Sequence, residues 1–148
     1  MKVDSKTISM TKSKQISHIG IAVENIDAVL SFYTDSLGLE LESIENVETE
    51  NVKVAFIKIG KSRLELLEPL NDSSVIRKFL DKKGEGIHHI ALESLDIRSR
   101  LQQLKQQGIP LINESTKTGA KNSQIAFIHP KAANGVLFEL CQHEGSDD

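Results

Sequence analysis

The chain has 148 residues, of which 39% are hydrophobic, and this is enough for one ordinary domain with a buried core. Its net charge of −3 gives no electrostatic reason to bind nucleic acid or an anionic membrane, and aromatic residues, which stack on single strands, make up only 4%. A single cysteine excludes an internal disulfide and fits a reducing compartment. No apolar run reaches the roughly 18 residues of a membrane span. We therefore expect a cytoplasmic protein with no membrane or nucleic-acid partner.

The first structural module is predicted over residues 16–70. It opens with a β-branched run at 19–23, which indicates a strand buried on both faces. Asn25 can cap a helix that Gly38 would end in the left-handed conformation, and apolar residues recur between them at helical spacing. Three strand candidates follow: 39–44, 52–59 and 63–67. A tight turn of Gly, Lys and Ser joins the last two into a hairpin.

The second module, over residues 86–142, repeats this order. A strand is predicted at 90–92, Asp96 caps the next helix, and Gly108 ends it. Three more strands are expected: 110–113, 124–129 and 136–141. Between the modules, Ser73 is expected to cap a linking helix over about 73–83.

This order of elements predicts an α+β fold made of two tandem βαβββ modules. A period of about 70 residues is too long for a solenoid, so we interpret it as a duplication within a single domain over residues 16–143. Residues 1–15 contain much Ser, Thr and Lys and little apolar content, and they predict a disordered tail.

Two pairs of potential metal ligands occupy matching positions in the repeat. His18 superposes on His89, and Glu65 superposes on Glu139. Both glutamates lie in apolar runs, where an ionised carboxylate is costly unless it is paired or bound to a metal. Taken singly, each histidine could be a half-buried polar residue, and each glutamate could lie on an exposed strand or form a salt bridge. The matched positions favour one shared site.

Two imidazoles and two carboxylates suit an octahedral divalent ion such as Co²⁺, Zn²⁺, Ni²⁺ or Mn²⁺, and affinity order alone does not choose among them. A structural zinc site would be tetrahedral and closed, often with several cysteines. Ligands spread over the whole chain instead indicate an open, catalytic site. An open divalent ion can bind two substrate oxygens and stabilise an enolate-type anion beside them.

Five runs resemble, in order, those of the methylmalonyl-CoA epimerase family within the vicinal oxygen chelate superfamily: HIGIAVENID, VKVAFIKIG, LELLEPL, GEGIHHIAL and HPKAANGVLFEL. They are distributed in order over the chain from about residue 16 to residue 142. The resemblance implies a half-open eight-stranded barrel around a metal site. It also implies interconversion of (R)- and (S)-methylmalonyl-CoA by proton transfer at C2 through a metal-stabilised enolate. We expect an acyl-CoA as the small-molecule partner and a homodimer as the assembly.

The resemblance implies four metal ligands: His18, Glu65, His89 and Glu139. It also makes Glu139 a candidate acid/base, because this residue would stand beside both the ion and the substrate α-carbon. For the opposite face, a loop glutamate of the family falls on Thr49 by an ungapped count. A shift of one residue gives Glu48, which is our choice, or Glu50.

Other positions in the matched runs have weaker assignments. His129 and Lys131, in the HPK turn, resemble the family's substrate-side loop and could meet the carboxylate or phosphates of a CoA thioester; an ordinary surface turn is the alternative. Asn134 stands where the family often has Gly, and Asn tolerates the left-handed conformation. His88 must point away from the face of its neighbour His89, so we expect it to pack or to form a hydrogen bond. The single cysteine is expected to be a small core residue, with no histidine placed to activate it.

Two other functions stay open. A glyoxalase I-type lactoylglutathione lyase uses the same His/Glu/His/Glu set, and only the flanking runs favour the epimerase. A metal-free small-molecule-binding protein of the same fold, as among antibiotic-resistance proteins, is disfavoured by the retention of all four ligand types. An extradiol dioxygenase needs only two histidines and one glutamate on iron, so the fourth ligand disfavours that activity.

Overall fold

The computed structural model describes residues 12–13 and 15–143, so most of the predicted tail lies outside the described residues. The chain divides into two compact units. The first comprises residues 17–90, and the second comprises the described residues from 91 onward together with those before Ser17. No helix in the described part of the chain is long and apolar enough to cross a membrane. A single domain over residues 16–143 stays a prediction.

The first unit contains the first module and the linking helix. Its elements are β1 (Ile16–Ala22), α2 (Ile26–Ser31), a π-helical turn (Phe32–Ser36), β2 (Glu40–Val47), a 3₁₀ turn (Glu48–Glu50), β3 (Val52–Ile59), β4 (Ser62–Pro69), α3 (Val75–Lys83) and the start of β5 (Gly86–Glu93). The hydrogen-bonded order of the strands is β2-β3-β4-β1-β5. Strand β1 is parallel to β4, and the other pairs along β2-β3-β4 are antiparallel.

The second unit begins within β5 and contains the second module. Its further elements are α4 (Ile97–Gln106), β6 (Lys117–Thr118), a 3₁₀ turn (Ala120–Asn122), β7 (Gln124–Ile128), a 3₁₀ turn (Pro130–Ala132) and β8 (Phe138–Gln142). The strands follow the order β5-β8-β7-β6, with β7 antiparallel to both β8 and β6. The predicted α+β fold of two βαβββ modules with eight strands is confirmed.

The helix boundaries expected from the repeat are confirmed in both modules. The side chain of Asn25 accepts a hydrogen bond from the backbone N–H three residues further on, at 3.0 Å, and Asp96 does the same at 3.2 Å. Gly38 and Gly108, which follow the two helical segments, have φ angles of 71° and 73°. Only glycine adopts this left-handed backbone without steric cost, so both helical segments end where the sequence predicted.

A second acceptor serves the start of each helix. The first N–H of α2, on Ile26, donates to Oε1 of Glu68 at 2.7 Å, and the first N–H of α4, on Ile97, donates to Oε1 of Gln142 at 2.8 Å. These N–H groups have no partner within their own helix. Glu68 lies three residues after Glu65, and Gln142 lies three residues after Glu139. The two acceptors therefore occupy matching positions in the two modules.

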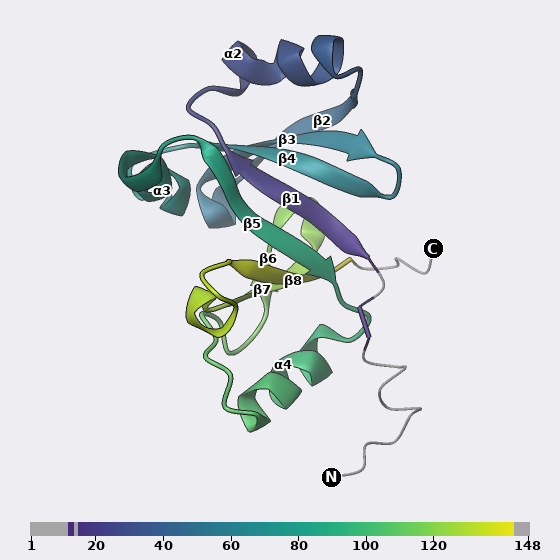
Figure 1. Cartoon of the computed structure of the whole chain (residues 1–148), viewed down its shortest axis with the longest axis vertical. Coiled ribbons are helices and arrows are strands. Elements are labelled where there is room, and N and C mark those ends of the chain that lie inside the picture. The colour runs from purple at the N-terminus through teal and green to yellow at the C-terminus, as the bar shows by residue number, and fades with distance from the viewer. Residues whose placement is uncertain (1–11, 14, 144–148) are drawn as a thin grey trace. The chain divides into compact units, whose positions relative to one another are not determined.

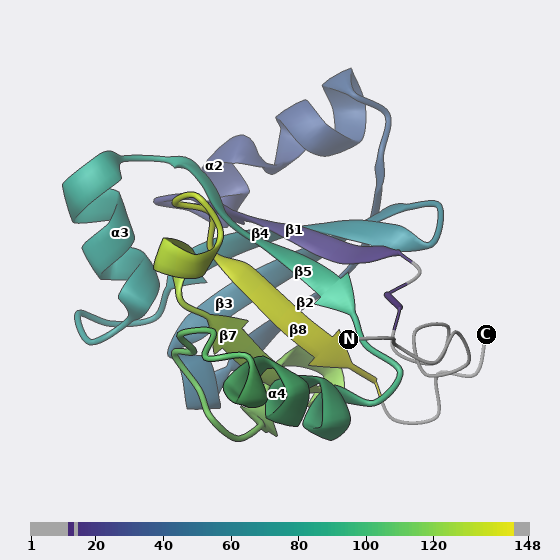
Figure 2. The ribbon, with the colours of Figure 1, turned by 60° about the horizontal axis from the view of Figure 1, so that its bottom comes forward.

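Each helix packs an apolar face on the strands of its own module. Ile26 of α2 packs with Leu66 of β4, and Figure 1 shows α2 along one side of β2, β3 and β4. Leu101 of α4 packs with Leu140 of β8, and Figure 2 shows α4 beside β7 and β8. Because side chains alternate along a strand, the residues that precede Leu66 and Leu140 in the sequence face away from the helices.

Helix α3 begins one residue later than predicted. Its N-cap is Ser74, whose hydroxyl accepts from the N–H of Ile76 at 3.2 Å, so the assignment of this role to Ser73 is wrong. The N–H and the hydroxyl of Ser73 both donate to the side-chain oxygen of Asn71, at 3.0 and 2.9 Å. Two adjacent serines offer the same capping chemistry, and the turn built on Asn71 decides between them.

The strand predicted at 110–113 is also wrong. This segment forms only an isolated bridge, from Leu111 to strand β7, and the module's additional strand is β6. Pro110 has no N–H to donate to a ladder. The side-chain oxygen of Asn113 accepts from the N–H of Phe127 at 2.9 Å, which is the role that a backbone carbonyl would have in a regular pair.

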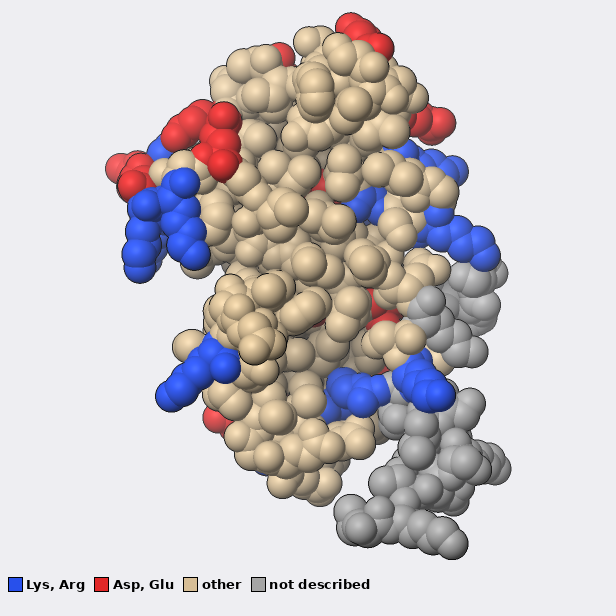
Figure 3. Space-filling model, in the orientation of Figure 1, with Lys and Arg blue, Asp and Glu red and all other residues tan. Residues whose placement is uncertain are grey.

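Charged side chains are dispersed over the face seen in Figure 3. Acidic and basic groups form small separate clusters, with wide uncharged stretches between them. This distribution agrees with a net charge of only −3. The visible face therefore carries no extended surface of one sign that would attract a polyanion.

Replacing Asp96 with alanine should lower the free energy of unfolding by about 1 kcal/mol at neutral pH, because the start of α4 loses its N-cap acceptor. Hydrogen bonds from the hydroxyl and the N–H of Ser99 lower the pKa of Asp96. A carboxylate whose pKa is lowered by folding stabilises the fold above its unfolded pKa of about 4, and this contribution is lost as the pH falls through the folded pKa. Urea unfolding of both proteins over a range of pH measures the difference.

Asn25→Ala is the matched control, because it removes the equivalent cap from α2 and an amide does not titrate. Its loss of stability should be similar in size and independent of pH. A difference between wild type and Asp96→Ala that stays constant into strong acid would contradict the assignment.

Candidate metal centre

Three adjacent strands of the first unit bring three of the predicted ligands together. His18 lies on β1, Glu65 on β4 and His89 on β5, and the strand order is β4-β1-β5. The three residues are only 5%, 6% and 5% exposed. Glu65 directly precedes Leu66, so it lies on the face of the sheet opposite to helix α2. Ionisable side chains buried to this extent need partners, and these three find them in one another.

The two imidazoles meet through the nitrogens that commonly bind metals. Nε2 of His18 lies 3.2 Å from Nε2 of His89, and the rings are nearly perpendicular, with their centroids 5.2 Å apart. Two ligand atoms about 2.1 Å from one ion, and at about a right angle to each other, would be roughly 3.0 Å apart. The separation of the two nitrogens therefore fits two ligands of one divalent ion.

Glu65 contacts the other nitrogen of His18. Its Oε2 atom lies 3.2 Å from Nδ1, and the buried hydroxyl of Ser17 lies 3.1 Å from the same nitrogen. A carboxylate that accepts the Nδ1 proton leaves the lone pair on Nε2, the form of histidine that binds a metal. This oxygen therefore orients the ring, and direct coordination by Glu65 would use its other oxygen.

His89 lies directly over the backbone of Gly20. A Cβ atom added to Gly20 would be 2.4 Å from Cε1 and 2.7 Å from Nδ1 of the His89 ring. Gly20 and His18 share a face of β1, and Gly20 pairs with Glu65 in the parallel register. The missing side chain at this position is therefore the space that the imidazole occupies. The sequence analysis did not identify this role, although a glycine inside a strand is a known sign of close approach.

His88 supports the same ring from the side. Its Nδ1 lies 3.0 Å from Nδ1 of His89, and its ring packs at right angles on Phe79 of α3, with a centroid distance of 5.0 Å. These contacts agree with the expectation that His88 packs and forms a hydrogen bond.

Glu139 lies in the second unit, at the position that matches Glu65 in the first. In the β7–β8 pair Glu139 is opposite Phe127, and in the β3–β4 pair Glu65 is opposite Phe56. Glu139 is 4% exposed. It directly precedes Leu140, so it faces away from α4. Each module therefore presents a buried carboxylate at the same place in its hairpin.

The single cysteine is a buried core residue, as expected, but it does have a histidine nearby. Sγ of Cys141 lies 3.8 and 3.9 Å from the two ring nitrogens of His143. The expectation that no histidine is placed near it is therefore wrong. The sequence did contain the signal, since His143 directly follows strand β8 and lies only two residues beyond the cysteine.

The candidates for the second acid/base lie in one short turn. Glu48 is exposed and Glu50 is partly exposed, in the 3₁₀ turn between β2 and β3. Asn51 ends this turn in the left-handed conformation, with φ of 54°. Glu48 therefore stays a prediction, with Glu50 as the alternative.

The HPK turn has a clear local structure. The Nδ1 atom of His129 accepts from the N–H of Lys131 at 3.0 Å, and this bond caps the 3₁₀ turn; both residues are exposed. Asn134 has φ of 59°, so the left-handed conformation expected of it is confirmed. The cap gives His129 a structural role, and contact of either residue with substrate stays a prediction.

Comparison with known proteins identifies the class. The Glyoxalase/Bleomycin resistance protein/Dioxygenase superfamily matches residues 17–127, and the chain belongs to this superfamily. The resemblance seen in the sequence is thereby confirmed.

Individual relatives are more specific. An uncharacterised protein of Bacillus subtilis is 45% identical over 131 residues, covering 88% of this chain and 94% of that protein. The mitochondrial methylmalonyl-CoA epimerase of Homo sapiens is 35% identical over 141 residues, covering 95% and 80%. Among solved structures, the Streptomyces coelicolor methylmalonyl-CoA epimerase in complex with 2-nitronate-propionyl-CoA has a TM-score of 0.86 at 36% identity, covering 90% of this chain and 97% of that one. A methylmalonyl-CoA epimerase in complex with methylmalonyl-CoA and NH4+ matches with the same values. The chain is thus a homologue of methylmalonyl-CoA epimerases, which are isomerases.

Replacing Gly20 with alanine should displace the imidazole of His89, because the added methyl group and the ring cannot occupy the same space. Overpacking of this kind costs about 1–3 kcal/mol of stability. We expect the ring-nitrogen resonances of His18 and His89 in nitrogen-15 spectra to shift together, and urea unfolding to report the loss of stability.

Gly86→Ala provides the control, since no heavy atom lies within 4 Å of a Cβ added there. It should leave the histidine resonances unchanged. Unchanged histidine resonances in Gly20→Ala would show that the close approach does not exist in solution.

Proposed function

We propose that this protein interconverts the (R) and (S) epimers of methylmalonyl-CoA. The observation that carries the proposal is the pair of buried imidazole nitrogens 3.2 Å apart, in a chain whose relatives are methylmalonyl-CoA epimerases. The substrate is accordingly a small acyl-CoA. We further propose a cytoplasmic homodimer, which is an expectation carried over from the sequence analysis.

We propose that one divalent ion is held by His18, Glu65, His89 and Glu139. The mutual distances and burial within the first unit support the first three, and the matched position in the repeat supports Glu139. Such an ion would act as a Lewis acid that stabilises negative charge on the substrate oxygens. The donor set does not choose among Co²⁺, Zn²⁺, Ni²⁺ and Mn²⁺.

The chain's own part in the reaction is to hold and move protons. The C2 proton of a malonyl-type thioester lies between two carbonyl carbons, so its removal leaves a delocalised anion. Epimerisation needs one group to take this proton from one face and another to return a proton to the opposite face. Glu139 is our choice for one face, and Glu48, or alternatively Glu50, for the other.

The surrounding residues would keep the site in order. Glu65 and Ser17 contact Nδ1 of His18, and His88 contacts Nδ1 of His89, so Nε2 of each ring would be left to bind the proposed ion. The exposed residue Lys131 could bind the phosphates of the coenzyme, beside the capping residue His129.

Metal binding tests the ligand set directly. After removal of metal with a chelator, titration with Co²⁺, followed by calorimetry, should give one site per chain. Loss of a residue that merely orients a ligand weakens metal affinity by about 10–100-fold, so His18→Ala and His89→Ala should exceed this range. His129→Ala is the control and should bind as the wild type does. A variant His88→Ala that loses the metal while His89→Ala retains it would show that the ligand assignment is wrong by one residue.

The reaction itself is tested by isotope exchange. Incubation with (R)- or (S)-methylmalonyl-CoA in deuterated water should introduce deuterium at C2, which mass spectrometry detects, and a chelator should stop the exchange. Glu139→Gln should slow it by at least about 100-fold, because a positioned acid/base contributes that much. Glu114→Gln, an exposed residue in the same unit, should exchange at the wild-type rate.

The same assay identifies the second acid/base and distinguishes an epimerase from a lactoylglutathione lyase. Whichever of Glu48→Gln and Glu50→Gln slows exchange from one epimer more than from the other marks the second acid/base. A protein that leaves both epimers unlabelled and converts methylglyoxal with glutathione would instead be a lactoylglutathione lyase.

A further inference from the structure

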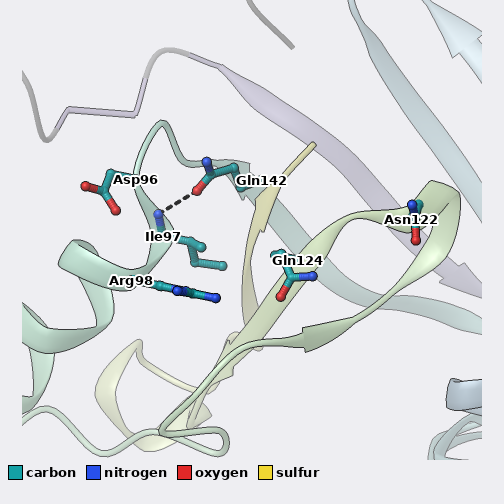
Figure 4. A pocket seen from close by; sticks show the side chains of 6 residues that line it. All are labelled: Asp96, Ile97, Arg98, Asn122, Gln124 and Gln142. Atoms are coloured by element: carbon teal, nitrogen blue, oxygen red, sulfur yellow. Dashed lines mark hydrogen bonds between the residues drawn. The ribbon is translucent and has the colours of Figure 1, made fainter. Parts of the chain in front are cut away.

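In the part of the chain that the structure describes, α3 is the helix that has no counterpart in the repeat. Helices α2 and α4 occupy matching places in the two modules, and each begins with an N–H group bonded to the end of its module's last strand, as Figure 4 shows for Ile97 and Gln142. Helix α3 instead connects β4 to β5, the strands that carry Glu65 and His89. None of its residues is a proposed ligand or acid/base, so any contribution of α3 to the site must be indirect.

Helix α3 is held at a defined place in the first unit. Its apolar side is buried, with Ile76 and Leu80 only 3% and 4% exposed. Its guanidinium group, on Arg77, donates from Nη1 and Nη2 to the two carboxylate oxygens of Glu24, at 2.8 and 2.9 Å. Two parallel bonds between planar groups fix their relative orientation. Because Glu24 follows β1 closely, the helix is attached to the strand that carries His18.

Phe79 of α3 carries this fixed position over to β5. Its ring lies edge-to-face with the imidazole of His88, with the centroids 5.0 Å apart and the planes at 88°. Aromatic pairs prefer this arrangement. On its own helix, the ring of Phe79 has Nζ of Lys83 over it, 5.8 Å from the centroid, within the range of a cation–π interaction. A perpendicular contact of this kind favours one orientation of the imidazole plane.

The plane of His88 matters because of the atom that it presents to His89. The two Nδ1 atoms are 3.0 Å apart, so one of them carries the proton and the other accepts it. If Nε2 of His89 binds the ion, the proton of this ring is on Nδ1, and His88 is the acceptor. The lone pair of an imidazole nitrogen lies in the plane of the ring. A change in the plane of His88 would therefore turn the acceptor away from His89.

We propose that Phe79 is a positioning residue for the metal centre, and that the linking helix α3 is thereby part of the site. By fixing the plane of His88, Phe79 keeps the proton of His89 on Nδ1. The lone pair of Nε2 is then directed to the side where Nε2 of His18 lies, 3.2 Å away. The inference rests on the proposed ligand set and deepens it, because it adds a residue that touches neither the ion nor the substrate.

The test compares ring-nitrogen spectra and metal affinity in full-length variants. In zinc-loaded wild type, nitrogen-15 spectra should show the proton of His89 on Nδ1 and that of His88 on Nε2. Phe79→Leu keeps apolar bulk at this partly exposed position but removes the ring. It should shift the ring nitrogens of both histidines and raise the dissociation constant for Zn²⁺ by about tenfold, the lower end of the effect of losing a group that orients a ligand.

Two further variants separate positioning from a general loss of packing. Phe79→Tyr retains the ring and should match the wild type in both measurements. Phe32→Leu is the matched control, because Phe32 forms a similar edge-to-face pair with Tyr33 in the same unit, with the centroids 5.3 Å apart. It should leave the histidine spectra and the zinc affinity unchanged, and urea unfolding should show that all three variants are folded.

The positioning role is overturned if Phe79→Leu has the histidine spectra and the zinc affinity of the wild type, or if Phe32→Leu changes them as much as Phe79→Leu does. A wild-type protein that binds no metal would instead overturn the proposed ligand set. In that case the same spectra of the metal-free proteins decide the remaining question. A joint shift of His88 and His89 in Phe79→Leu would still show that α3 orients these imidazoles, and unchanged spectra would show that it does not.

Discussion

Three almost completely buried ionisable side chains, one of which is within hydrogen-bonding distance of the other two, impose the main constraint on this fold. His18, Glu65 and His89 have lost their water, and an unpaired polar group in such a place costs several kcal/mol. Each finds its partner only while β4, β1 and β5 keep their register, since a slip of one residue would turn the side chain to the other face. The pairing of these three strands therefore determines both the sheet and the positions of the site residues. The cost of burying these groups is tolerable because the strands hold them together.

The sequence predicted those features that each module encodes twice. Asn25 and Asp96 are both N-caps, and Glu65 and Glu139 are both buried opposite a phenylalanine in the same hairpin. A single residue of these types would support several interpretations. Recurrence at matching positions excludes most of these interpretations, because residues of the same type rarely occupy matching positions of both modules by chance. The four ligand candidates could therefore be named from sequence, and so could the two βαβββ modules.

Features that depend on one contact between distant residues could not be predicted in this way. Gly20 resembles any glycine of a buried strand until the ring of His89 is placed on it. Ser73 and Ser74 are chemically identical candidates for one cap, and only the turn before them separates their roles. The segment starting at Pro110 has the apolar composition of a strand, but its bonds to β7 include a side-chain oxygen in place of a carbonyl. The pattern of apolar residues does not reveal that a side-chain oxygen has replaced a backbone carbonyl as the hydrogen-bond acceptor.

The bonds from Ile26 to Glu68 and from Ile97 to Gln142 have a consequence for how such a protein can originate. Each joins the start of a module's helix to the end of that module's last strand, so each module closes on itself. A half-length ancestor would already have satisfied the first N–H of its helix, and doubling its gene would have required no new partner for it. In the present chain, one module carries a carboxylate at this position and the other carries an amide. The oxygen that accepts the bond is common to both, which shows how a duplicated fold can change its charge while retaining its architecture.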